Sequence, residues 1–216
     1  HLERAALVAA FGGQADAWEE CGARRMHVGV GRGNRGGGGG YGGGGGGVDI
    51  DIKSMEAGQQ LHAYAVLKEN TKLLSFEPHL HAPGERMCLE AIWGYNIQTI
   101  NCVGYDHNWV RGYDYDDDSA PLLPKDTILH IVGYMDNSPS NKNVPDPRNW
   151  QGSGNRSVAN MFIDLGNRVF LNDEQFHAEM AARREKLKLT RNSVVIGCPL
   201  CNVMPQPPAT APRQQQ

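Results

Sequence analysis

The sequence has 216 residues, which is enough for one domain with a hydrophobic core and flexible ends. Its formal charge of −3 excludes a strongly basic chain of the kind that binds nucleic acid or anionic membranes through charge alone. We therefore expect no nucleic-acid partner. Because no apolar run approaches the roughly 18 residues that cross a bilayer, we also expect no transmembrane segment of its own.

Glycine is concentrated near the start of the chain. Of 27 glycines, 11 lie between Gly36 and Gly47, interrupted only by Tyr41. Such a segment buries too little apolar surface to offset its chain entropy. We predict that residues 1–47 form a flexible N-terminal segment in which residues 2–18 form a short helix. Whether the glycine tract is real sequence or a placeholder stays open.

From residue 48 onward, short runs with alternating apolar residues are separated by turn residues, which is typical of β-strands. The expected strands cover residues 48–52, 61–67, 72–81, 86–93, 97–103, 127–135 and 157–165. Short strands at this spacing favour an all-β fold, namely an antiparallel, jelly-roll-like β-sandwich. We expect this domain to span residues 48–203, followed by a disordered tail at residues 204–216.

One helix is predicted to be appended to the sandwich at residues 173–188. Asn172 is its expected N-cap, with Gln175 at the third helical position of a capping box. Phe176, Met180 and Leu187 lie on one stripe of this helix and are expected to pack on the sandwich.

Four of the five cysteines are expected to form two disulfides. Cys88 and Cys102 lie opposite each other if the chain folds as a hairpin about Tyr95, which suits a bridge. Cys198 and Cys201 have the spacing of a redox motif or half a zinc site, but no second pair lies nearby, so a local disulfide is the preferred interpretation. Two disulfides predict an oxidising compartment.

The sequence His79-Leu80-His81 is the strongest candidate for metal chemistry. In a strand, residues two apart point to the same face, so the two imidazoles lie side by side as half of a metal site. The alternative is a polar pair on a solvent-facing strand. Met161 is our candidate third ligand because thioether and imidazole together favour copper, although a buried methionine also serves as core filling. The isolated histidines His27, His62, His130 and His177 are interpreted as structural.

These residues belong to a series of segments that resembles a known family. The segments are Pro-His-Leu-His-Ala-Pro-Gly at 78–84, Tyr-Asp-His-Asn-Trp at 105–109, Leu-Pro-Lys-Asp-Thr at 123–127, Tyr-Met-Asp-Asn-Ser at 134–138, and Met161. In this order they resemble the C-terminal domain of copper type II, ascorbate-dependent monooxygenases, and the bacterial members most closely. The resemblance implies an antiparallel sandwich with an oxygen-activating copper held by His79, His81 and Met161.

The chain also departs from that family. The complete enzymes have a second, electron-supplying copper held partly by a His-His pair, and no two histidines are adjacent here. Peptide-hydroxylating members anchor the carboxylate of their substrate with three polar residues. The corresponding positions of this chain hold Glu77, Ile163 and Leu165, which disfavours a carboxylate substrate. In the segment at residues 105–109, the family usually has an aromatic residue where this chain has His107. We interpret His107 as a residue that supports the metal ligands or as an alternative ligand.

The resemblance therefore implies a periplasmic or extracellular copper-binding domain, with ascorbate as an electron donor. It would not be a complete enzyme alone, and oxygen activation would require a second copper domain or a partner protein. The alternative is a non-catalytic structural or accessory subunit of a larger membrane-associated electron-transfer or photosynthetic assembly. No catalytic residue beyond the metal ligands is assigned.

Overall fold

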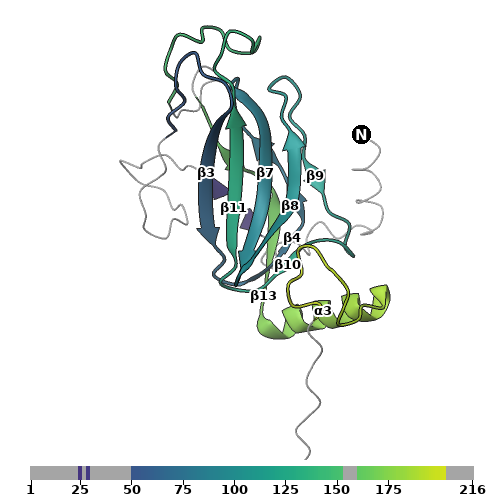
Figure 1. Ribbon diagram of the computed structural model, residues 1–216. Coiled ribbons are helices and arrows are strands. Elements are labelled where there is room, and N and C mark those ends of the chain that lie inside the picture. The colour runs from purple at the N-terminus through teal and green to yellow at the C-terminus, as the bar shows by residue number, and fades with distance from the viewer. Residues whose placement is uncertain (1–23, 26–27, 30–49, 153–159, 203–216) are drawn as a thin grey trace, which may run out of the picture.

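The computed structural model describes residues 24–25, 28–29, 50–152 and 160–202. This part of the chain is an all-β fold of antiparallel sheets with one helix near its C-terminal end, as the sequence predicts (Figure 1). The larger sheet has the order β3-β11-β7-β8. Its strands are β3 (Gln59–Val66), β11 (Ile128–Met135), β7 (Gly84–Trp93) and β8 (Asn96–Gly104).

Shorter strands form the opposing layer behind this sheet (Figure 1). One sheet has the order β1-β13-β4-β10, a second β2-β12-β6, and a third pairs β5 with β9. The strands are β1 (Arg24–Arg25), β2 (Val28–Gly29), β4 (Asn70–Leu73), β5 (Ser75–Phe76), β6 (Pro78–His79), β9 (Tyr113–Asp114), β10 (Leu122–Leu123), β12 (Ile163–Asp164) and β13 (Asn167–Leu171). The single strand predicted at residues 72–81 is thus divided among β4, β5 and β6, because its backbone changes partner from β13 to β9 to β12.

The hydrophobic core lies between the two layers and follows the strand alternation. On β7, Met87, Leu89 and Ala91 point inward and are buried, whereas Glu90 between them points to the outer face. The opposing layer contributes buried side chains from its short strands and their connections, namely Leu73, Phe76, Leu80, Leu123 and Phe162. This two-sided burial holds the layers together as a sandwich.

The first strands of the fold precede the predicted domain boundary at residue 48. β1 pairs with β13, and β2 pairs with β12. Strand pairing therefore extends into the segment for which the sequence predicts flexibility. The helix predicted at residues 2–18, the glycine tract at 36–47 and the tail at 204–216 lie outside the described residues.

The helix α3 (Asp173–Leu187) confirms the predicted capping box, in which Asn172 and Gln175 each accept a hydrogen bond from the other's backbone N–H. Phe176 and Met180 are buried as expected. Leu187 was predicted wrongly, since it is 43% exposed and lies in the last position of the helix, whereas the buried residue at this end is Arg183. None of the helices in the described ranges is long and apolar enough to cross a membrane.

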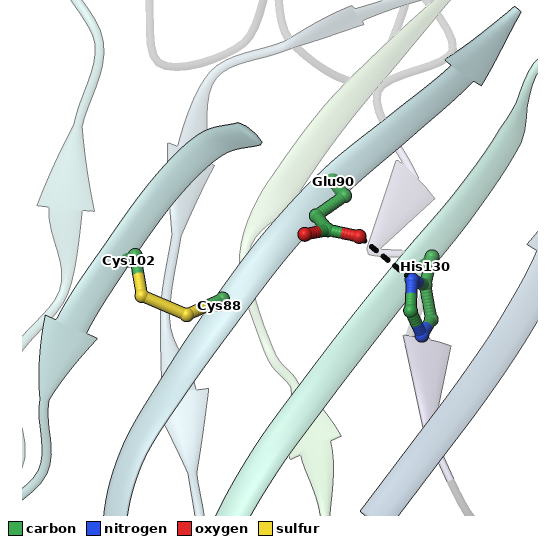
Figure 2. Close-up of a disulfide and its surroundings, with 4 residues drawn as sticks. All are labelled: Cys88, Glu90, Cys102 and His130. Carbon is green, nitrogen blue, oxygen red and sulfur yellow. Dashed lines mark hydrogen bonds and ion pairs between the residues drawn. A yellow bond between two sulfur atoms is a disulfide. The ribbon is translucent and has the colours of Figure 1, made fainter. Parts of the chain in front are cut away.

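Both predicted disulfides are present. Cys88 and Cys102 are directly opposite in the β7–β8 pairing, and Figure 2 shows their bridge across the two strands. Cys198 and Cys201 are both buried in a second apolar cluster beneath α3. Their bridge closes a local turn, and the packing of both residues in this cluster holds the segment after the helix against the sandwich.

Candidate metal centre

The His-x-His segment begins in β6 and continues into a tight turn. Leu80 is fully buried in the core, so the alternation of the strand places His79 and His81 together on its other face. The centroids of the two rings are 5.4 Å apart. His81 is buried and His79 is half-buried. The side-by-side arrangement predicted for the two imidazoles is therefore present.

The turn after His81 is held by backbone contacts. The N–H of Gly84 donates to the carbonyl of His81 at 2.7 Å, and a Cβ at this glycine would lie 2.5 Å from Leu80 Cβ. Only glycine permits this close approach. In addition, the Asp136 N–H donates to the Pro83 carbonyl at 2.7 Å. Because Asp136 directly follows β11, the turn lies at the end of the sandwich opposite α3 (Figure 1).

Met161 lies two residues before β12, which pairs with β6. In that pairing Ile163 is opposite His79. If the antiparallel register continues by two residues, Met161 is opposite His81, and directly opposed residues share one face of a sheet. Phe162 supports this orientation because it is fully buried against Gly133 and therefore points into the core. With that register, the half-buried Met161 would lie on the same face as the two imidazoles.

A buried carboxylate fixes β12 next to β6. Asp164 accepts hydrogen bonds from the backbone N–H groups of Glu77 at 3.0 Å and Gly166 at 2.8 Å. Its second oxygen accepts from Arg168 at 2.6 Å, and both side chains of this ion pair are fully buried. The carboxylate therefore joins the chain just before His79 to the chain just after Met161.

His107 lies beside this pair although it belongs to a different loop. Its ring centroid is 6.1 Å from that of His81. Asp106 shapes the turn around it by accepting from the N–H groups of Asn108 and Trp109, each at 2.9 Å. The hydroxyl of the preceding Tyr105 donates to the carbonyl of Leu80 at 2.5 Å, which ties this loop to the His-x-His segment.

The electrostatic surroundings keep His79 neutral. Burial lowers the pKa of His79 below its ordinary value of 6.5, and repulsion from His81 and His107 lowers this pKa further. A neutral imidazole is the form that binds a metal, so the ligand state is favoured near neutral pH.

The donor set fits copper. Two neutral imidazoles and a thioether favour copper over magnesium or calcium, which prefer oxygen ligands. The Nδ1 atom of His107 is buried without a hydrogen-bond partner, which leaves a nitrogen donor available beside the pair. Among the described residues, no group of three His, Cys, Asp or Glu side chains is already arranged around one point.

A cleft of about 380 Å³ lies near the start of the His-x-His segment, and none of the candidate ligands lines it. It borders Pro78 and Asp106, which directly precede His79 and His107 in the chain. The other lining residues include charged and aromatic side chains, namely Glu85, Tyr105, Trp109, Arg111 and Tyr113.

A second polar network lies on the outer face of the larger sheet, and no sequence pattern predicted it. A carboxylate oxygen of Glu90 lies 2.8 Å from His130 Nδ1 and forms a hydrogen bond with it (Figure 2). The other ring nitrogen of His130, Nε2, lies 2.9 Å from His62 Nδ1. Tyr64 stacks on His130 with ring centroids 4.2 Å apart. The sequence could indicate only that Glu90, His130 and His62 occupy outward positions on three expected strands. It could not indicate that these strands are neighbours in the sheet. The structural role expected of His62 and His130 agrees with these contacts.

Comparison with family models and with curated proteins found no match to this chain. The resemblance described above therefore rests on the quoted segments alone.

Proposed function

We propose that this chain is a copper-binding β-sandwich domain related to the oxygen-activating half of ascorbate-dependent monooxygenases, with His79, His81 and Met161 as ligands. The observation that supports this most is the register of β6 and β12, since Ile163 opposite His79 leads to Met161 opposite His81. If this register continues to residue 161, three donors from two distant segments share one face.

The surroundings of the ligands support the same function. The buried Asp164 holds the two segments together, and Gly84 and Asp136 fix the turn that follows His81. When bound, copper would supply one-electron and oxygen chemistry at this position. The residues of the chain bind and orient it, keep His79 neutral, and limit the access of water to the buried His81.

Two disulfides are typical of proteins that fold in an oxidising compartment. We accordingly propose a periplasmic or extracellular location. A second copper domain or a larger membrane-bound assembly is the proposed partner, because the chain has no adjacent histidines for the family's electron-supplying site.

Metal analysis of the purified chain tests the ligand assignment. We expect about one copper per chain after loading and dialysis, and a loss of bound copper in His79→Ala and in Met161→Leu. His177→Ala is the matched control, because His177 is exposed on α3 and should leave the copper content unchanged. Equal copper in His79→Ala and in the unmodified chain would contradict the assignment.

Oxygen consumption separates a catalytic from an accessory role. For an incomplete enzyme we expect copper-loaded chain with ascorbate to consume little oxygen until the partner is added. Sustained consumption by this chain alone would overturn the proposal that a partner is required, and copper binding with no consumption under any condition would favour the accessory subunit.

A further inference from the structure

Building on the copper-binding function proposed above, we infer that His107 supplies a third imidazole to the metal centre. The cation would then be held by His79, His81 and His107, with the thioether of Met161 as the weaker ligand. This assigns the loop between β8 and β9 to the site, in addition to the two paired segments.

The spacing of the rings supports a shared ion. The ring of His81 has neighbours at centroid distances of 5.4 Å to His79 and 6.1 Å to His107. Metal–nitrogen bonds of about 2.0–2.1 Å place the ring centres of neighbouring imidazole ligands roughly 5 to 6 Å apart. The His79–His81 separation falls within this range, and the His81–His107 separation lies just beyond it. Because the ring nitrogens do not yet converge within the described residues, binding requires side-chain rotation.

The imidazole of His107 has one ring nitrogen without a hydrogen-bond partner. Its Nδ1 atom is buried and makes no hydrogen bond in the structure. A buried polar atom without a partner is energetically unfavourable, and coordination of a cation would offset this cost. The loop is fixed on both sides, by Tyr105 on the Leu80 carbonyl and by Asn108 Nδ2 donating to Asn143 at 3.1 Å. These contacts hold His107 beside the other two rings.

The chemistry of three imidazoles defines the class of cation. Three neutral nitrogen donors and one thioether suit Cu(II) and Zn(II), and offer nothing to hard cations that need oxygen ligands. Removing one imidazole should weaken binding of either ion, whereas a site of only two imidazoles and a thioether would not depend on position 107. The two arrangements can therefore be distinguished by the same measurements on both metals.

Titration of the metal-free full chain with Cu(II) and separately with Zn(II) tests this inference, with competition by a chelator of known affinity. The variants are His107→Phe, which keeps a ring without a donor, and His107→Gln, with His177→Phe as the control. We expect each His107 variant to lower both affinities at least tenfold, which is the lower end of the loss caused by supporting residues of metal sites. Electron paramagnetic resonance of the Cu(II) form should show coupling to three nitrogens, falling to two in His107→Phe.

The outcomes separate this inference from the proposed function. Copper binding with two coupled nitrogens and unchanged affinity in His107→Phe would overturn the role of His107 while leaving the copper site in place. Zinc binding that depends on His107, in a chain that does not retain copper, would support the three-imidazole site and contradict the copper function. Absence of binding for both ions would overturn both. Circular dichroism of each variant establishes that a lost affinity is not lost folding.

Discussion

The buried carboxylate of Asp164 gives the sharpest test of how the centre is held together. Replacing it in Asp164→Asn keeps the shape of the side chain but removes its charge. The guanidinium of Arg168, which is also fully buried and donates to this carboxylate at 2.6 Å, then lacks its partner. Its Nε and Nη1 atoms have no hydrogen bond in the described structure, so no other contact replaces the lost one.

The expected loss is large. Breaking a buried ion pair from one side costs about 3–5 kcal/mol of unfolding free energy because an uncompensated charge remains. At a urea dependence of roughly 2 kcal/mol per molar, the midpoint of unfolding should fall by about 2 M. Urea titration followed by tryptophan fluorescence measures this shift, and copper affinity should decrease with it because Asp164 joins β12 to β6.

Two further variants make the result decisive. Asp146→Asn removes a carboxylate of the exposed pair with Arg148 and should leave the midpoint unchanged, since exposed pairs contribute little. The double variant Asp164→Asn, Arg168→Met should recover part of the stability, because an apolar side chain needs no charge partner. An Asp164→Asn midpoint equal to that of Asp146→Asn would refute the reasoning.

Three other predictions concern stability. Folding lowers the pKa of His79 below its unfolded value of 6.5, so the metal-free chain should lose stability as the pH falls below 6.5. In urea titrations between pH 7 and pH 5, the His79→Gln variant should lose less stability than the unmodified chain. Paired Cys88→Ser, Cys102→Ser substitutions should cost up to about 3 kcal/mol, because the bridge closes a loop with a sequence separation of 14; an unchanged thermal midpoint would contradict this. Asn172→Ala removes the helix cap and should cost about 1 kcal/mol, measured by the same melting experiment.

Local patterns predicted the parts of the fold that depend on neighbouring residues. The β7–β8 hairpin follows from two alternating runs around Gly94, whose positive φ of 57° suits a tight turn. The same hairpin places Cys88 opposite Cys102, and the capping box at Asn172 marks the start of α3. These features require only residues that are close along the chain.

Features that depend on distant partners were not predictable in the same way. The run at residues 72–81 has one continuous pattern, yet its partners are three different strands. His107 was a candidate from its place in a quoted segment, but its position beside His81 follows from the Tyr105 contact with the Leu80 carbonyl. The pairing of Glu90 with His130 depends on β11 lying next to β7, a neighbour relation that no local pattern specifies.

The contact chain of Glu90, His130 and His62 offers a natural reporter of assembly. Its members come from β7, β11 and β3, and its two contacts join residues 40 and 68 positions apart. The largely buried imidazole of His130 makes both contacts only when all three strands are aligned, which slows the exchange of its N–H proton. The nuclear magnetic resonance signal of this proton would therefore follow the docking of the central strands directly, with no label added to the protein.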